Sequence, residues 1–291
     1  MKNSYLFLHV AIVLAGFTAV FGKLISLNEG LLVWYRLLFT SIILFLILNL
    51  FRKPDRIAFG DKYSIAKIGM LLTIHWIFFY ASIKYSNISI GVVCYCLTSF
   101  FTAVFKPLID RTRFKLSELL LSALTLLGIG LIFHFDVSYR LGLVLGVISS
   151  AFAALYTIYN ERLVKRYDSM LMNYYQMIGG TVGLTALLPV YLYFVPVESL
   201  FPGWKDIAYL ILLSLFCTVG LYVLFAEALK RIPAFTVNLS FNLEPIYSII
   251  MAFLFFGEAK EVNTAFYAGL LLVMTSVALQ SYVSVRKVVR F

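Results

Sequence analysis

Long apolar runs, each bounded by charged or polar residues, alternate with short polar segments along the whole chain. Each run has about the 20 residues that an α-helix needs to cross the ~30 Å hydrocarbon core of a bilayer. The runs therefore predict ten membrane-spanning helices. Their expected bounds are Tyr5–Ser26, Leu31–Phe51, Ile65–Tyr85, Ser89–Leu108, Ser117–Phe135, Arg140–Tyr159, Ser169–Phe194, Asp206–Leu229, Pro233–Phe256 and Val262–Val283.

Composition supports the same class of protein. Of the 291 residues, 62% are hydrophobic and 13% are charged, and the mean hydropathy is +0.94. Soluble globular domains have roughly 45–50% apolar and 25% charged residues, so this class is excluded, as are disordered chains, disulfide scaffolds and coiled coils. Ten spans use about 200 residues and leave only short loops, with no room for a further soluble domain. We predict an all-α integral membrane protein in the lipid bilayer.

The net charge of +10 indicates an orientation rather than a nucleic-acid partner, because the basic residues punctuate the apolar runs instead of gathering on one polar domain. Of the Lys and Arg residues in loops and tails, sixteen fall on one side of the predicted spans and four on the other. The positive-inside rule then places both termini in the cytoplasm, in a multi-pass protein of the cell (inner) membrane. The first apolar run is longer than that of a signal peptide, and we expect it to be retained.

The two halves of the chain look duplicated. A shift of 146 positions brings Ser82-Ile83-Lys84 onto Ala228-Leu229-Lys230, each at the end of a predicted span. Each half would hold five spans, and because five is odd the second half enters the bilayer from the opposite side. Such an inverted repeat is typical of secondary transporters, whose solute site lies near the midplane between the halves. The expected division is 1–135, 140–285 and a short basic cytoplasmic tail at 286–291.

Five features carry a family resemblance. The segment 228–234 (ALKRIPA) resembles an A-L-x-x-x-x-A junction, 242–245 (NLEP) an L-x-P helix break, and Gly257-Glu258 a terminal G-E pair. Lys23 and Arg36 fall where a lysine late in the first span and an arginine in the second are common. On these residues the whole chain resembles the ten-span, EamA-type members of the drug/metabolite transporter superfamily. The resemblance implies a carrier of amino acids or related metabolites, working by efflux, with nucleotide-sugar or hydrophobic-drug carriers as alternatives.

Ionisable residues inside the spans are the first candidates for the solute site, because each costs ~2.5–3.5 kcal/mol at the helix centre unless it is paired or hydrated. His75 and Glu244 lie nearest the midplane, and Pro245 disturbs the helix beside Glu244 by removing a backbone donor. Arg36 lies nearer the outer surface and would hold a solute carboxylate through bidentate hydrogen bonds. A salt bridge from Arg36 to Glu29 is the structural alternative, and for His75 it is a neutral ring bonded to a neighbouring helix.

Polar residues complete the predicted site. Gln176 is the counterpart of Arg36 at a shift of 140, Asn242 lies on the same helix face as Glu244, and Tyr95 lies deep in its span. Lys23 would assist Arg36 or extend its ammonium to the membrane surface. The predicted substrate-binding residues are Lys23, Arg36, His75, Tyr95, Gln176, Asn242 and Glu244.

Motifs for chemistry are missing from the sequence. It contains no G-x-S-x-G, H-E-x-x-H, paired membrane aspartates or Walker glycine loop, so we predict no catalytic residues, no cofactor and no enzyme activity. The cysteines lie in apolar runs and the histidines lack metal-ligand spacing, so no metal site is expected. An intramembrane enzyme and a channel remain as weaker alternatives.

Small residues recur at helical spacing in the second half. Gly142 and Gly146, and then Gly179 and Gly183, form G-x-x-x-G patterns that let helix backbones approach closely. We expect these glycines to pack within the chain, and a homodimer seam is the alternative.

Overall fold

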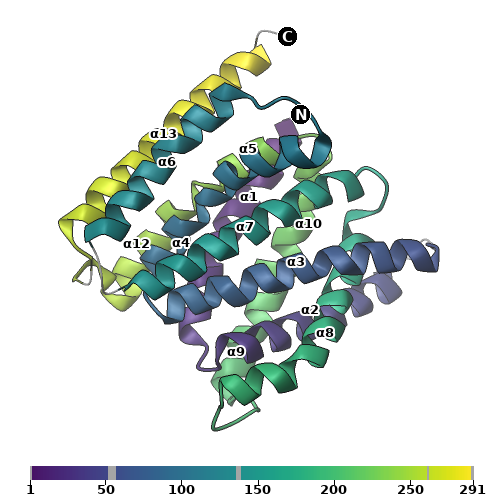
Figure 1. The fold of residues 1–291 in the computed structure, drawn as a ribbon. Helices are drawn as coiled ribbons and strands as arrows, with labels where there is room; N and C mark the ends of the chain where they lie inside the picture. Colours follow the sequence, from purple (N-terminus) through teal and green to yellow (C-terminus); the bar gives the residue numbers. More distant parts are fainter. Residues whose placement is uncertain (1, 52–56, 136–138, 261, 290–291) are drawn as a thin grey trace.

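The computed structural model describes residues 2–51, 57–135, 139–260 and 262–289 (Figure 1). Within these ranges every regular element is a helix and no strand occurs, which confirms the all-α prediction. The elements are α1 (Lys2–Leu24), α2 (Glu29–Phe51), α3 (Phe59–Lys84), α4 (Ile88–Tyr95), α5 (Leu97–Asp110), α6 (Leu116–Phe135), α7 (Arg140–Leu163), α8 (Ser169–Phe194), α9 (Trp204–Ser214), the π-helix η2 (Leu215–Gly220), α10 (Leu221–Leu229), α11 (Ala234–Phe241), α12 (Glu244–Phe256), the 3₁₀-helix η3 (Glu258–Lys260) and α13 (Thr264–Val289).

Eight stretches of the described chain are long and apolar enough to cross a membrane. They comprise five single helices, α1, α2, α3, α7 and α8, and three composite ones, α4–α5, α9–η2–α10 and α11–α12. The apolar parts of α6 and α13 are shorter, Leu116–Leu131 and Thr264–Ser276. A multi-pass membrane protein is therefore confirmed, and the count of ten spans stays a prediction.

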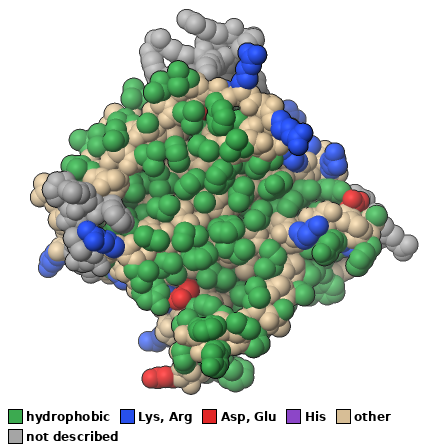
Figure 2. All heavy atoms as spheres, in the orientation of Figure 1, with side chains coloured by type: hydrophobic (Ala, Val, Ile, Leu, Met, Phe, Trp, Pro, Cys, Tyr) green, Lys and Arg blue, Asp and Glu red, His purple; other side chains and the backbone are tan. Residues whose placement is uncertain are grey.

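The helices form a bundle with α6 and α13 side by side along one flank (Figure 1). Thr125 on α6 donates a hydrogen bond of 3.0 Å to Ser276 on α13. Elsewhere in the bundle α3 packs against α7 and α8, and α1 packs against α10 and α12. Figure 2 shows a broad face of hydrophobic side chains with Lys and Arg toward its edges. Such a surface suits lipid contact, because a soluble protein rarely exposes so continuous an apolar face.

Two of the predicted spans are interrupted near the centre of the bundle. α4 and α5 meet at Cys96, whose amide bonds the Val93 carbonyl at 3.1 Å in a tightened turn. α11 and α12 meet at Asn242, whose amide bonds the Leu239 carbonyl at 3.1 Å. The prediction of a break beside Pro245 is confirmed. The span predicted over Ser89–Leu108 is found at Ile88–Asp110, but its helix is interrupted at Cys96, which the sequence did not predict. No proline marks Cys96. The Ser99 hydroxyl donates a hydrogen bond to the Cys96 carbonyl at 3.0 Å, and such side-chain bonds compete with the regular backbone bonds of a helix.

Other bounds also differ from the prediction. α3 begins at Phe59 rather than Ile65, and the mostly polar residues 60–64 form its partly exposed first turns, ahead of the apolar run. α13 continues to Val289, beyond the predicted end at Val283 and into the segment expected to be a tail. The predicted continuous helix Asp206–Leu229 contains the π-helix η2 in its middle.

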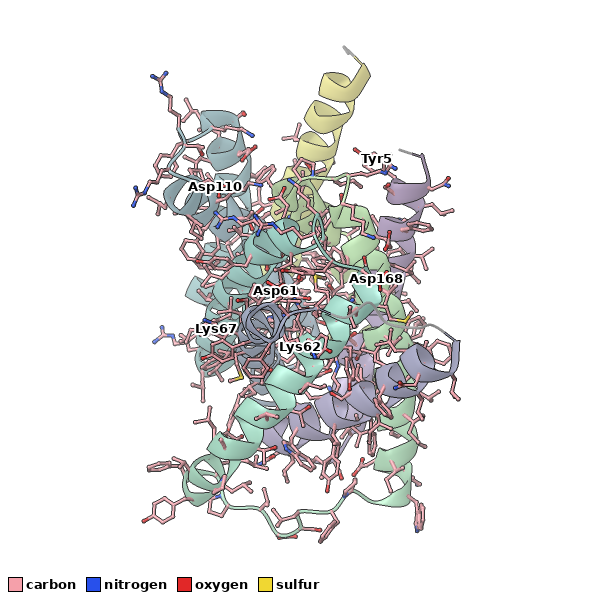
Figure 3. The ribbon with its side chains drawn as sticks, turned by 90° about the vertical axis from the view of Figure 1, so that its right-hand side faces the viewer. Tyr5, Asp61, Lys62, Lys67, Asp110 and Asp168 are labelled. Atoms are coloured by element: carbon pink, nitrogen blue, oxygen red, sulfur yellow. The ribbon has the colours of Figure 1, made fainter. Side chains whose placement is uncertain are left out.

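Ionic contacts connect the helix ends at one end of the bundle, here called the basic end. Arg162 pairs with Asp110, and Glu227 accepts hydrogen bonds from Lys230 at 2.6 Å and Ser169 at 2.7 Å. Figure 3 looks onto this part of the molecule, with Asp61 and Lys62 at the start of α3 and Asp168 just before α8. These contacts thus bring together, at one end, the described loops at 111–115, 164–168 and 230–233, which were predicted to lie on the positive side of the membrane.

The other end of the bundle, here called the opposite end, carries its own contacts. Lys23 pairs with Glu258 at 2.7 Å, and Asp206 accepts hydrogen bonds from the Ser26 amide at 2.9 Å and hydroxyl at 2.5 Å. Lys84 donates to the Ile25 carbonyl at 3.2 Å. A surface hollow of about 580 Å³ opens among these loops.

The glycine patterns pack helices within the chain, as expected. A Cβ on Gly142 would lie 2.6 Å from Ser86, and one on Gly179 would lie 2.3 Å from the Ala66 carbonyl oxygen. Where α3 crosses α8, a Cβ on Gly69 would lie 2.0 Å from the Gln176 carbonyl oxygen. The α3–α8 crossing therefore depends on backbone contact. A homodimer stays a prediction.

We expect Gly69→Ala to destabilise the protein by about 1–3 kcal/mol, because the added methyl overlaps a backbone carbonyl and forces α3 and α8 apart. Gly60→Ala, in the same helix, is the matched control, since its Cβ would have no neighbour within 4 Å. Thermal unfolding of both variants in detergent measures the difference. Equal melting temperatures would contradict the close α3–α8 contact.

Candidate functional site

Seven helices surround a small central cavity of about 30 Å³, which has room for one or two water molecules. The cavity lies beside both helix breaks, because Tyr95 ends α4, Phe241 ends α11 and Glu244 begins α12. The structure is thus closed around its centre. The lining residues are Ala15, Thr18, Arg36, His75, Trp76, Phe79, Tyr95, Leu221, Tyr222, Phe241 and Glu244.

Arg36 is completely buried and held by protein groups. Its Nε donates to the Thr218 hydroxyl at 2.8 Å, one terminal nitrogen to the Tyr80 hydroxyl at 2.7 Å and the other to the Cys217 carbonyl at 2.9 Å. The guanidinium stacks on Trp76, with 3.7 Å between Cζ and the ring centroid. These contacts use one N–H of each nitrogen, and two of the five N–H donors remain. The alternative of a salt bridge to Glu29 is wrong.

The π-helix η2 supplies two of the three acceptors around Arg36. A π-helical turn shifts the backbone bonding register by one residue, so that carbonyls become available to other donors. Here the Cys217 carbonyl and the Thr218 hydroxyl both face Arg36, and Thr218 also donates to the Leu213 carbonyl at 3.0 Å. The π-helix η2 therefore provides acceptors that stabilise the buried charge of Arg36.

Glu244 faces the cavity with only 4% of its surface exposed. Within the described part of the chain, no group makes a hydrogen bond or ion pair with its carboxylate, and Arg36 is the other charged residue of the lining. Glu244 lies in the first turn of α12, where the helix dipole favours a negative charge. The cavity thus holds one carboxylate that is free to meet a ligand.

His75 and Tyr95 line the same cavity. His75 Nδ1 lies 2.8 Å from the Ser149 hydroxyl and 3.1 Å from the Ser149 carbonyl. The Ser149 hydroxyl proton goes to the His75 carbonyl at 3.0 Å, so Nδ1 is the donor and Nε2 is left as an acceptor. The His75 and Tyr95 rings lie 5.4 Å apart. His75 is hydrogen-bonded to the neighbouring helix α7, which is the structural role considered for it from the sequence, and it also lines the cavity.

The structure brings together four of the seven predicted site residues, Arg36, His75, Tyr95 and Glu244. The other three do not line the cavity. Lys23 pairs with Glu258 at the opposite end. Gln176 donates to Asn160 at 2.8 Å and accepts from Tyr156 at 3.1 Å.

Asn242, the third of these, lies in the turn between α11 and α12 and donates to the Ser99 hydroxyl at 3.3 Å. Its side chain therefore joins the two helix breaks to each other. The amide oxygen of Asn242 is buried and has no hydrogen-bond partner among the described residues.

The predicted site residues include Tyr95 but leave out the rest of the aromatic wall, Trp76, Phe79, Tyr222 and Phe241. Trp76 donates to the Tyr222 hydroxyl at 3.0 Å, and their rings meet edge to face with centroids 5.5 Å apart. Trp76 and Tyr222 are 146 positions apart, the same shift that relates the two halves. Their alignment was therefore a signal in the sequence that these two residues occupy equivalent positions.

Comparisons with known proteins place this geometry in context. The profile of the EamA-like transporter family matches residues 2–134 and again 140–282. An uncharacterised transporter of Clostridium kluyveri is 21% identical over 280 residues, covering 90% of this chain and 88% of that protein. The uncharacterised transporter YdfC of Bacillus subtilis is 26% identical over 233 residues, covering 77% and 73%. A crystal structure with 14% identity matches with a TM-score of 0.68 over 98% of this chain and 99% of its own.

We expect Arg36→Lys to lower the free energy of unfolding by about 2 kcal/mol or more, because a single ammonium cannot serve three buried acceptors and also stack on Trp76. Arg162→Lys is the control, since Arg162 is half-exposed and pairs with Asp110 at the basic end. Denaturant unfolding in detergent compares the two variants. Equal losses would show that the guanidinium contacts contribute little to the fold.

Proposed function

Because the chain belongs to the EamA-like transporter family, we propose that this membrane transporter is a secondary carrier of small organic metabolites, with amino acids as the leading substrates and export as the leading direction. The observation that supports an amino acid is the pair of opposite charges on one central cavity, Arg36 and Glu244. Arg36 keeps two N–H donors for a carboxylate, and the carboxylate of Glu244 has no protein partner among the described residues that could compete with an ammonium group.

Aromatic rings favour a solute that also has an apolar part. Trp76, Phe79, Tyr95, Tyr222 and Phe241 form the walls between the two charges. Apolar walls with a few placed polar groups are typical of small-molecule sites. The same walls with Glu244 alone would suit a hydrophobic cation, which is the specific reason to keep a drug carrier as the second candidate.

The closed cavity supports alternating access as the mechanism. A space of about 30 Å³ is far below the ~300 Å³ or more of typical ligand pockets, so a solute requires another conformation to enter. We propose that the two segments matched by the family profile are inverted repeats of five helices, spanning 1–135 and 140–285, for ten spans in all. The helix breaks support this, because Tyr95 and Phe241, which end α4 and α11, are 146 positions apart.

Orientation follows from charge. The loops with the excess of Lys and Arg meet at the basic end, so we propose that this end and both termini lie in the cytoplasm of a cell with the protein in its inner membrane. An exported solute would then enter from the basic end and leave toward the hollow at the opposite end.

We expect amino acids to stabilise the purified protein, by about 2.7 kcal/mol at a hundred times the dissociation constant, because ligand binding favours the folded state. A thermal-shift panel should compare each amino acid with its decarboxylated amine and its deaminated acid. Both analogues should stabilise less, since each leaves one cavity charge unpaired. Stabilisation by the amine alone would favour the hydrophobic-cation carrier, and countertransport in proteoliposomes then confirms transport of the ligand found.

We expect Glu244→Gln to reduce kcat/KM for an ammonium-bearing solute about a hundredfold, because a buried charge pair is lost from the complex. The control is Glu227→Gln, which removes a carboxylate that is paired with Lys230 and lies away from the cavity. Initial rates of countertransport measure both variants. Full activity of Glu244→Gln would remove Glu244 from the proposed site.

A further inference from the structure

Two glutamates hold the starts of the two interrupted helices, one at each end of the bundle. At the opposite end Glu258 accepts hydrogen bonds from the Ile88 amide at 3.0 Å, the Ser89 amide at 3.0 Å and the Ser89 hydroxyl at 2.8 Å. The ammonium of Lys23 on α1 pairs with the same carboxylate at 2.7 Å. One carboxylate thus connects α1, the start of α4 and the end of α12.

The basic end contains the corresponding arrangement. Glu161 on α7 accepts a hydrogen bond from the Ala234 amide, at the start of α11, at 3.1 Å, and its second oxygen pairs with Lys106 on α5. Ile88 and Ala234 are the first residues of α4 and α11 and are 146 positions apart. A carboxylate and a lysine therefore meet the start of each half-helix, at opposite ends of the molecule.

The lysine and the glutamate exchange their places between the two arrangements. Lys23 lies in the last turn of α1, the first helix of its half, whereas Glu161 lies in the last turn of α7, the first helix of the other half. Each ion pair also joins the halves, because Lys23 pairs with a residue of the second half and Glu161 with Lys106 of the first. A lysine–glutamate pair thus occurs at both ends of the molecule, but the first helix of one half supplies the lysine and the first helix of the other half supplies the glutamate.

We infer that Lys23–Glu258 and Lys106–Glu161 are the two gates of the transport cycle, which open in alternation. This inference rests on the proposed alternating access and adds the residues that control it. Both gates are closed in this structure, in agreement with the small central cavity. Opening one gate separates the start of one half-helix from α1 or α5 and gives access to the cavity from that end only.

The two gates differ at their carboxylates, because the lysines are exposed to similar extents, 31% for Lys23 and 28% for Lys106. Glu258 has a fully buried side chain with four donors, whereas the side chain of Glu161 is 13% exposed and has two donors. Charged hydrogen bonds are stronger in a dry environment than beside water. The gate at the basic end therefore opens more readily.

Two introduced cysteines report which of the two gates is open. Ala19 lies on α1 between the cavity residue Ala15 and Lys23, at four-residue spacing on one helix face. Thr102 lies on α5 between Tyr95 and Lys106 and is bonded to Asn238 on α11 at 2.8 Å. Both side chains are buried when the gates are closed. The reporters are Ala19→Cys and Thr102→Cys, and the parent chain gives the background from its three buried native cysteines.

The test is the alkylation rate of each reporter by N-ethylmaleimide in detergent, with and without a gate substitution. Glu258→Gln should make the Ala19→Cys thiol react about tenfold faster and the Thr102→Cys thiol slower, because weakening one gate shifts the population toward the state open at that end. Glu161→Gln should have the reverse effect. Asp110→Asn removes a neighbouring ion pair without touching α11 and should change neither rate.

Faster alkylation of both reporters in either variant would indicate general loosening and would overturn the gates, as would unchanged rates. Lys23→Gln and Lys106→Gln repeat the test with the carboxylates intact, in case a glutamate variant fails to fold. The assay needs no substrate. Opposite changes in the two rates without countertransport would therefore refute the proposed function alone, and countertransport without such changes would refute the gates alone.

Discussion

The burial of Arg36 is the constraint on which the centre of this structure depends. A guanidinium cannot lose its proton inside a protein, so its charge must be stabilised where it lies. No carboxylate is bonded to it among the described residues. Instead, α3 supplies the Trp76 ring and the Tyr80 hydroxyl, and η2 supplies the Cys217 carbonyl and the Thr218 hydroxyl. These contacts fasten α2, α3 and η2 to one another as one wall of the cavity.

The wall that faces Arg36 is built differently. It includes the ends of α4 and α11 and the start of α12. At these points the regular backbone hydrogen bonding of the helices is interrupted. Half-helices can tilt about their breaks at little cost, because the lost helix bonds are already replaced by tightened turns at Cys96 and Asn242. The cavity thus has one charge, Arg36, on a wall joined by several polar contacts, and the other charge, Glu244, beside the interrupted helices.

The sequence predicted much of this arrangement where a local signal existed. Apolar runs gave the helices, Pro245 marked one break, and the rarity of charges in membrane spans singled out Arg36 and Glu244. The break at Cys96 could not be predicted, because no proline marks it in the sequence. The π-helix η2 could not be predicted either, because its Cys217 carbonyl accepts a hydrogen bond from Arg36, about 180 positions away. Lys23 looked like an interfacial lysine because its partner, Glu258, is 235 positions away.

The unequal strength of the two ion pairs bears on the direction of transport. With Glu258 fully buried and Glu161 partly exposed, we expect the empty protein to open more readily at the basic end, which we propose faces the cytoplasm. A solute can open the stronger gate only if it binds more tightly to the state open at the opposite end than to the other. For export, the free energy needed to release Lys23 from Glu258 must therefore come from contacts that the solute gains as the cavity turns outward. The charges of Arg36 and Glu244 are the groups in the cavity best able to provide such contacts, since charged hydrogen bonds are the strongest available to a small ligand.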